Sequence, residues 1–333
     1  MPLAPALPTA LGAHFTSAAA RARGVSVSRL RASDLALHFH GTRSRILPPE
    51  IHAARNSPEA RREEAARLIA AVAPRLVQGQ FFSHESAALL WGIPVPTNFA
   101  LHPHLCAQSP AHSPRVKGTI GHTVEPHRCS VTWAHGFPLT SAVCTWAMLG
   151  GWRVPELVAA GDYLVRRFTP GVGRKSLGGR PLATVDELRE AVSFGRWRGM
   201  GRLREAVTLI REDSWSPMES QMRVAIVQSG LPEPALNRDV FTASGKFLGC
   251  VDMVYSRFLV GIEYQGRIHH DQYAEDIERV EALRANGWYI IQVSSALASK
   301  PSVLCNRIEA ALRERGWMPD STSRPKRAAH RSD

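Results

Sequence analysis

The alternation of apolar and polar residues is clearest in the C-terminal third of the chain. Residues 247–255 and 258–264 are two runs rich in β-branched and aromatic side chains, and the short Ser256-Arg257 segment between them predicts a hairpin. Residues 269–285 carry apolar side chains at helical spacing, and 288–293 form a short apolar run typical of a buried strand. The pattern therefore predicts strand, turn, strand, helix and strand in this order.

The elements around this stretch begin and end at recognisable residues. Ser216 is a good N-cap, a proline occupies the first helical position, and Glu219 supplies an acid at the third. This helix ends at Gly230, a short strand is expected near Val240, and residues 301–315 form a closing helix. The predicted order of the C-terminal region is α, β, β, β, α, β, α.

Two acidic residues interrupt the apolar hairpin. If the turn centres between Ser256 and Arg257, Asp252 on the first strand lies opposite Gly261 on the second. Glu263 is two residues beyond Gly261 and shares its face, because strand side chains alternate. The two carboxylates are then diagonal neighbours, about 7–8 Å apart at the backbone.

Carboxylates in such an apolar setting cost several kcal/mol each unless a cation or hydrogen bonds offset the lost hydration. Mg²⁺ takes carboxylate oxygens and keeps its other positions for water and phosphate. The hairpin therefore predicts a metal site at Asp252 and Glu263, with Gln265 on the same face. The alternatives are a solvated strand end with unrelated acids, and a Glu219 that only caps its helix.

The N-terminal region predicts a helix-turn-helix. Residues 16–23 form a first helix, a glycine turn follows, and a second helix runs from Ser26 or Ser28 to Leu35. Residues 38–46 are suited to a β wing, and the alternative is a small solvated helical hairpin. The basic residues placed to face DNA phosphates are Arg21, Arg23, Arg29, Arg31, Arg43 and Arg45.

The rest of the chain predicts a mostly helical middle region and a basic connector. Within the middle, residues 100–105 resemble a strand on which His102, His104 and Cys106 alternate on one face. No fourth ligand follows at a suitable interval, which disfavours a metal site there. The expected domains are a head at 14–50, a helical middle at 51–175, a basic helical connector at 176–212, a C-terminal domain of strands and helices at 213–316 and a disordered basic tail at 317–333.

Composition adds an expectation about partners and compartment. The 333 residues carry a formal net charge of +12, which indicates a polyanionic partner. The five cysteines are widely spaced and form no Cys-x-x-Cys pair, so neither a disulfide framework nor a zinc ribbon is expected. The chain shows no secretory signal and no apolar run long enough to span a membrane. A cytoplasmic, DNA-binding protein fits these features.

The C-terminal region resembles the restriction-endonuclease-like core of the PD-(D/E)XK nucleases, in element order and in the spacing of Asp252, Glu263 and Gln265. Within that group it is similar to uncharacterised proteins related to very-short-patch-repair (Vsr) endonucleases. The matching residues are Ser216-Pro-Met-Glu219, Gly230-Leu-Pro, Val251-Asp252, Ile262-Glu-Tyr-Gln-Gly266, His269, Asp276, Arg279, Leu283 and Gly287-Trp288.

This resemblance implies a Mg²⁺- or Mn²⁺-dependent DNA endonuclease. Asp252 and Glu263 would hold the metal, Gln265 would position the attacking water, and Glu219 would support the site. His269 would transfer a proton, although it also suits a plain position at the start of a helix. Gln265 stands where the motif has lysine, which removes a positive charge near the scissile phosphate.

The N-terminal region resembles the AbiEi-type abortive-infection antitoxins. The matching segments are 15–45, Ser83-His-Glu-Ser-Ala-Ala88 with Gly92-Ile-Pro94, Pro138-Leu-Thr140 and Gly161-Asp162. This likeness implies a winged-helix DNA-binding head followed by a mostly helical region. The alternative to an endonuclease is therefore a non-catalytic DNA-binding regulator of the antitoxin kind. A third option is an RNA nuclease or a toxin-system component that acts with a partner protein.

Overall fold

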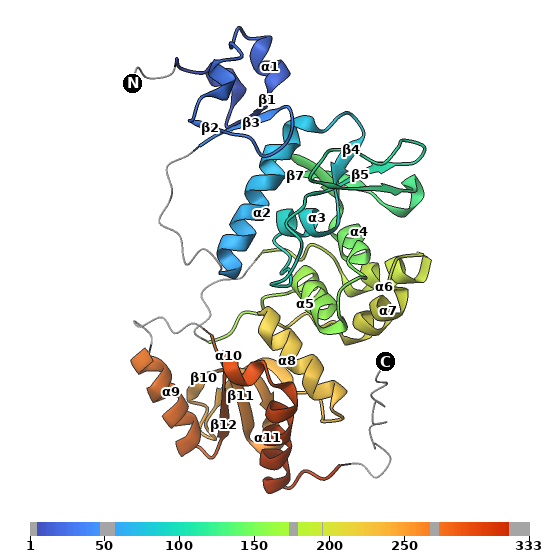
Figure 1. The fold of residues 1–333 in the computed structure, drawn as a ribbon. Helices are drawn as coiled ribbons and strands as arrows, with labels where there is room; N and C mark the ends of the chain where they lie inside the picture. The colour runs from blue at the N-terminus through green and yellow to red at the C-terminus, as the bar shows by residue number, and fades with distance from the viewer. Residues whose placement is uncertain (1–4, 47–56, 173–178, 195, 267–272, 320–333) are drawn as a thin grey trace, which may run out of the picture. The chain divides into compact units, whose positions relative to one another are not determined.

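The computed structural model describes residues 5–46, 57–172, 179–194, 196–266 and 273–319. The protein is of the α+β class, and these described residues form three separate sheets (Figure 1). Its contacts divide the chain into two compact units, the first of residues 1–152 with 187–200 and the second of residues 153–186 with 201–333. No helix in the described ranges is both long and apolar enough to cross a membrane.

The first unit begins with a small three-stranded antiparallel sheet of strand order β1-β3-β2. The Thr16 side chain caps the first helix by accepting the Ala19 N–H at 3.1 Å. Its elements are η1 (Thr9–Leu11), β1 (His14–Thr16), α1 (Ser17–Arg21), η2 (Arg29–Arg31), β2 (Leu35–Ala36) and β3 (Thr42–Arg45).

The second helix expected in this head is a single 3-10 turn, η2. Two serine hydroxyls explain the difference, because Ser26 Oγ contacts Ser28 Oγ at 3.0 Å and accepts the Arg29 N–H at 3.2 Å. Such local bonds offer the backbone an alternative to the helix. The helix-turn-helix expected here is therefore much reduced.

The middle of the chain contains a five-stranded mixed sheet of order β6-β5-β4-β8-β7. The expectation of a mostly helical region needs correction here, because strands of three to five residues are too short to show a clear period. Its elements are α2 (Pro58–Val72), η3 (Ala73–Arg75), β4 (Gln80–Phe82), α3 (His84–Trp91), β5 (His104–Gln108), β6 (Ile120–Val124), η4 (Pro126–Arg128), β7 (Val131–Ala134), β8 (Phe137–Thr140) and α4 (Ala142–Met148). The strand expected at 100–105 is displaced to β5.

The predicted helical connector contains α6 (Val185–Phe194) and α7 (Met200–Leu209). The second unit also contains α5 (Val154–Val165), a helix within the range predicted as the middle region. This helix packs against α8 (Pro217–Gln228). Arg223 of α8 is fully buried and pairs with Asp162 of α5 at 2.9 Å and with Glu233 at 2.9 Å. Removal of one partner from such a buried pair costs several kcal/mol, so α5 is held firmly to α8.

The C-terminal sheet has the order β12-β11-β10-β9, with β10 antiparallel to both neighbours and β11 parallel to β12. The element order predicted from the sequence is found, with one short helix, α10, added. The elements are α8, β9 (Ala235–Phe241), β10 (Phe247–Tyr255), η5 (Ser256–Phe258), β11 (Val260–Gln265), α9 (Tyr273–Ala285), β12 (Tyr289–Ser294), α10 (Ser295–Ala298) and α11 (Pro301–Glu314).

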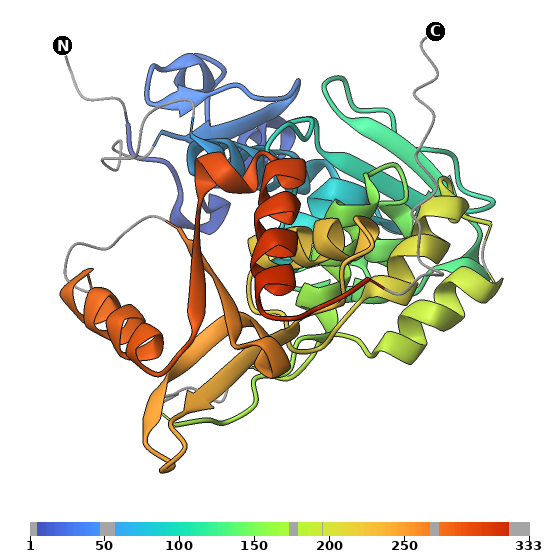
Figure 2. The ribbon, with the colours of Figure 1, turned by 90° about the horizontal axis from the view of Figure 1, so that it is seen from below.

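Helices cover both faces of this sheet (Figure 1 and Figure 2). On one face, Met222 and Ile226 of α8 and Ile308 of α11 share a core with β10, β11 and β12. On the other face, Val280 and Leu283 of α9 pack against the sheet. The two carboxylates of the hairpin belong to the face that α9 covers.

Candidate active site

The hairpin places Asp252 and Glu263 closer together than the sequence suggested. Met253 pairs with Ile262, so the same register brings Asp252 directly opposite Glu263 rather than opposite Gly261. The turn is longer than expected, because residues 256–259 connect the strands through η5 and a left-handed Leu259. The Tyr264 N–H donates to Asp252 Oδ2 at 2.8 Å, which fixes the carboxylate beside the end of β11.

Glu219 does more than cap α8. Its N–H donates to Ser216 Oγ at 3.2 Å, as predicted for this helix start. Its carboxylate, however, accepts the Trp215 N–H at 3.0 Å and the Asn237 side-chain amide at 2.8 Å. The residue is only 6% exposed. A buried carboxylate is therefore anchored between the start of α8 and strand β9.

Asn237 is a site residue that sequence reasoning missed. Its φ is +48°, and its amide also donates to the Asp213 carbonyl at 2.8 Å. Val251 and Met253 pair with the residues on either side of Asn237, so this strained position lies across from Asp252. An asparagine within a strand pattern is a weak signal for such a position, because asparagine tolerates positive φ better than most residues. The amide thus links β9 to the acidic cluster.

Arg279 of α9 is the resident cation of the cluster. Its guanidinium pairs with both oxygens of Glu263, and it also donates to Asp276, three residues earlier in the helix, at 3.1 Å. A Cβ at Gly249 would lie 2.8 Å from Arg279 Cδ, so glycine is needed there for the arginine stem to pass. Glu263 is only 3% exposed, and this ion pair offsets much of the cost of its burial.

The electrostatics of the cluster favour an added cation. Burial raises the pKa of Asp252 to about 7, and the carboxylates of Glu219 and Glu263 contribute to this rise, while the Tyr264 N–H and Arg279 oppose it. The buried Glu219 and Glu263, the partly buried Asp252 and one guanidinium leave an excess of negative charge at high pH. Carboxylate oxygens are the ligands that Mg²⁺ and Mn²⁺ prefer, and Asp252 with Glu263 fit such an ion.

The remaining predicted residues of this site are placed only in part. Gln265 is the last residue of β11 and lies two residues beyond Glu263, so it points to the same face of the strand. His269 lies outside the described residues. The proton-transfer role expected for it stays a prediction.

The six arginines of the N-terminal head fall into two groups. Arg21, Arg23 and Arg31 are exposed. Arg29 is 9% exposed and forms a two-pronged bond to Asp34 at 2.8 and 2.7 Å.

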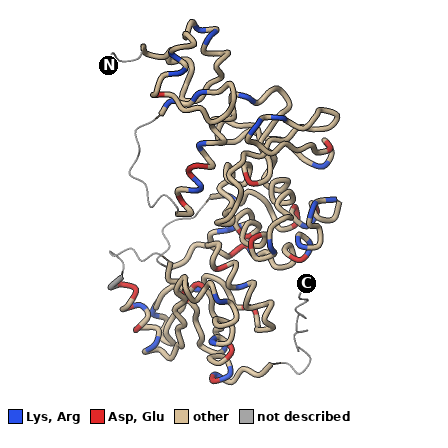
Figure 3. Tube along the Cα trace, in the orientation of Figure 1, with Lys and Arg blue, Asp and Glu red and all other residues tan. Residues whose placement is uncertain are grey.

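The other two head arginines bond to backbone carbonyls, Arg43 to that of Leu30 and Arg45 to that of Gly12. Arg29, Arg43 and Arg45 therefore hold the head together. Outside the head, Lys and Arg residues are spread along the chain in both units (Figure 3).

A second polar cluster lies in the first unit. His84, His104 and His122 each offer a ring nitrogen, and these atoms lie within 4.8 Å of one another. Burial lowers the pKa of His84 to about 2 and that of His122 to about 4, and it also lowers the pKa of His104. Within the described ranges, no other group of His, Cys, Asp or Glu brings three ligand atoms this close. The exposed His102 is not part of it.

The comparisons with known proteins give no assignment. No protein-family model matches the chain, and searches of curated proteins and of solved structures find no match. The likenesses of the two ends of the sequence to known families stay predictions.

Proposed function

We propose that the second unit is a Mg²⁺- or Mn²⁺-dependent endonuclease that hydrolyses phosphodiester bonds of DNA. The observation that carries this proposal is the position of Asp252 directly opposite Glu263, on the face of the sheet that carries Arg279. The element order on which the resemblance rests, α, β, β, β, α, β, α, is the order of these elements apart from the added α10, and this supports the proposal. The net charge of +12 suits a nucleic-acid substrate.

Asp252 and Glu263 would hold the metal, which lowers the pKa of a bound water and polarises the phosphate when present. The Tyr264 N–H orients the Asp252 carboxylate, and Asn237 keeps Glu219 beside it. Gln265 is an amide, so it can orient water but cannot neutralise charge on the phosphate. Arg279 can supply that positive charge, because a guanidinium released from Glu263 binds phosphate oxygens well.

One observation favours a second function. Arg279 already satisfies both oxygens of Glu263, so a metal must compete with a guanidinium for that carboxylate. With Gln265 in place of lysine, the same fold would suit a non-catalytic DNA-binding regulator, alone or with a toxin-system partner protein. That protein would bind duplex DNA with strong salt dependence and would not cleave it with any divalent ion.

Nicking of supercoiled plasmid by the full chain, with and without Mg²⁺ or Mn²⁺, tests the proposal. We expect metal-dependent nicking that Asp252→Asn and Glu263→Gln each reduce by at least about 100-fold, more than is typical for residues that only support a metal ligand. Glu309→Gln is the matched control, because Glu309 lies on α11 and pairs with Arg313. Equal nicking by Glu263→Gln and wild type would overturn the mechanism, and duplex binding without nicking would favour the regulator.

A further inference from the structure

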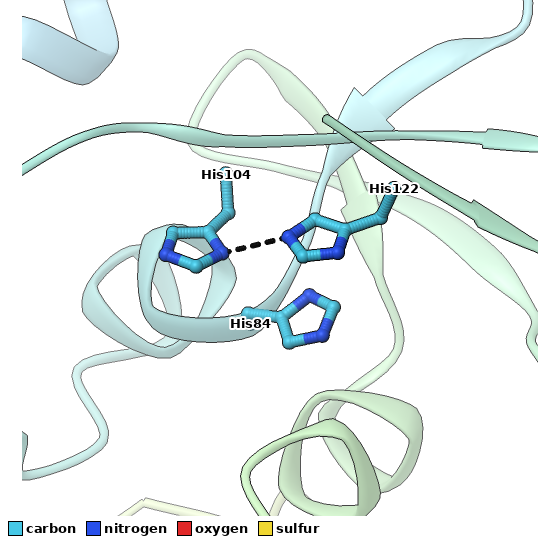
Figure 4. A group of neighbouring side chains, drawn as sticks. All are labelled: His84, His104 and His122. Atoms are coloured by element: carbon cyan, nitrogen blue, oxygen red, sulfur yellow. Dashed lines mark hydrogen bonds between the residues drawn. The ribbon is translucent and has the colours of Figure 1, made fainter. Parts of the chain in front are cut away.

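We propose that His84, His104 and His122 form a binding site for a transition-metal ion, with Zn²⁺ as the best-suited ion. Three imidazoles from three different elements meet at this point of the first unit (Figure 4). His104 Nδ1 and His122 Nε2 lie 2.9 Å apart. The His84 ring lies 3.9 Å from the His122 ring and 5.3 Å from the His104 ring, measured between centroids.

The sheet brings two of these histidines together. β5 and β6 are parallel neighbours in which Cys106 pairs with His122 and His104 pairs with Ile120. His104 and His122 are therefore diagonal neighbours on one face, because residues two apart in a strand share a face. His104 Nδ1 and His122 Nε2 are already in hydrogen-bond contact, so the proton between them lies where a metal ion would bind.

The backbone brings in the third histidine at a conformational cost. His84 has a φ of +49°, in the left-handed region that costs a non-glycine residue about 1–3 kcal/mol. It follows β4 closely and occupies the first position of α3, where Ser83 is the N-cap. Strained positions of this kind cluster at ligand sites. The strain is an observation independent of the side-chain cluster, and it places the imidazole against the other two rings.

A carboxylate outside the cluster orients one of the ligands. Glu85 Oε2 lies 3.2 Å from His104 Nε2, and Glu85 Oε1 accepts the Trp152 indole N–H at 3.1 Å. A proton on His104 Nε2 that is donated to Glu85 leaves Nδ1 with a lone pair directed at His122. Histidine ligands of metal ions commonly donate their second N–H to a carboxylate in this way, which fixes the tautomer.

The donor set selects the class of metal. Three neutral imidazoles suit Zn²⁺ and its neighbours such as Co²⁺, Ni²⁺ and Cu²⁺, and they do not suit Mg²⁺. Two nitrogens bound to one tetrahedral Zn²⁺ lie roughly 3.4 Å apart, so the 2.9 Å pair needs only a small separation. The His84 ring is stacked on the His122 ring, so it must turn to direct a nitrogen at the ion. Three protein ligands leave the fourth position to water or another ligand. The bound ion would tie the start of α3 to β6, an edge strand of the five-stranded sheet.

Titration of the metal-free full chain with Zn²⁺, against a chromophoric chelator, tests this site. We expect one equivalent to bind to wild type, with the affinity reduced at least about tenfold in His84→Asn and His122→Asn. His102→Asn is the matched control, because His102 is exposed and close in sequence. Glu263→Gln should also bind like wild type, which separates this site from the acidic cluster.

Replacement of Zn²⁺ by Co²⁺ gives a readout from the wild-type protein alone, so it does not require any variant to fold. Wild type should show the intense visible bands of a four- or five-coordinate Co²⁺ site. Circular dichroism of each metal-free variant checks that it is folded. Equal Zn²⁺ affinity of His122→Asn and His102→Asn, or a weak octahedral Co²⁺ spectrum for wild type, would overturn the proposal.

Discussion

The two polar clusters of this protein solve the problem of burial in opposite ways. The acidic cluster of the second unit carries formal charge, and Arg279 neutralises part of it through Glu263. The histidine cluster of the first unit is kept neutral. Its rings are held by the hydrogen bond between His104 and His122, by that between His84 and Ser83, and by the contact of His104 with Glu85. A buried cluster of charged groups therefore needs an opposite charge within the protein, whereas a cluster of neutral imidazoles is stable without a bound ion. Each is suited to a different class of metal ion, hard for the acids and borderline for the imidazoles.

The largest expected effect concerns the counter-ion. Arg279→Met should lower the free energy of unfolding by about 3 kcal/mol in the presence of a chelator, because it leaves Glu263 buried without a cation. Urea unfolding measures this loss. Saturating Mg²⁺ should recover much of it, since an ion can then replace the guanidinium.

Arg284→Met, at an exposed position in the last turn of the same helix, is the control for this change. Equal stability of the two variants would show that Glu263 does not depend on Arg279. A loss that Mg²⁺ leaves untouched would argue that no ion enters the acidic cluster.

The next effect separates the two clusters by metal. Free Zn²⁺ at 100 times its Kd should stabilise wild type by about 2.7 kcal/mol, seen as a rise in the melting temperature. His122→Asn should lose this gain and Glu263→Gln should keep it. With Mg²⁺ the pattern should reverse, so that His122→Asn keeps the stabilisation and Glu263→Gln loses it. The same response of both variants to both ions would remove the distinction.

A smaller effect concerns the proton of Asp252. Its pKa is raised to about 7 in the fold from 3.8, so between these values the folded state binds more protons than the unfolded chain. The free energy of unfolding therefore falls as pH rises through this window. This difference in pKa corresponds to at most about 4 kcal/mol in the free energy of unfolding, and about 2 kcal/mol is realistic for a partly exposed residue.

Asp252→Asn should therefore be more stable than wild type by about 2 kcal/mol at pH 8 in a chelator, and the gain should vanish near pH 4. Unfolding in urea at a series of pH values measures it. A difference that does not change with pH would mean that Asp252 titrates normally.

The smallest expected effect concerns the head, where an exposed arginine is compared with one that bonds to backbone carbonyls. Arg31→Ala should weaken duplex DNA binding and reduce the slope of log affinity against log salt concentration by about 0.9, if Arg31 contacts one phosphate. Arg45→Ala should instead lower stability, because Arg45 bonds to the Gly12 and Pro8 carbonyls. Fluorescence anisotropy at several salt concentrations distinguishes them. Equal slopes for Arg31→Ala and wild type would place DNA elsewhere.

The acidic cluster was within reach of sequence reasoning because its main acids lie on adjacent strands of one hairpin. The alternation of the strands and the serine-proline start at Ser216 predicted the elements. The register was wrong by two residues, because η5 and Leu259 lengthen the turn. Asn237 and the passage for Arg279 beside Gly249 depend on tertiary contacts, which the local pattern does not contain.

The histidine cluster was out of reach for a different reason. His104 and His122 are 18 residues apart, and they meet only because β5 and β6 pair in parallel. The sequence placed His102 and Cys106 beside His104, but the strand begins at His104 itself. The reduced second helix of the head shows the same limit, since the bonds of Ser26 compete with a helix that its neighbours favour.

The four-residue connection of the hairpin has a consequence for variation at this point. Opposed residues on antiparallel strands share a face, so a change of two residues in the length of the connection keeps Asp252 and Glu263 on the same side. A change of one residue would turn Glu263 towards the apolar layer formed with α8 and α11. Whether the two carboxylates share a face thus depends on whether the change in connection length is even or odd. Insertions of two residues should be tolerated where insertions of one residue are not.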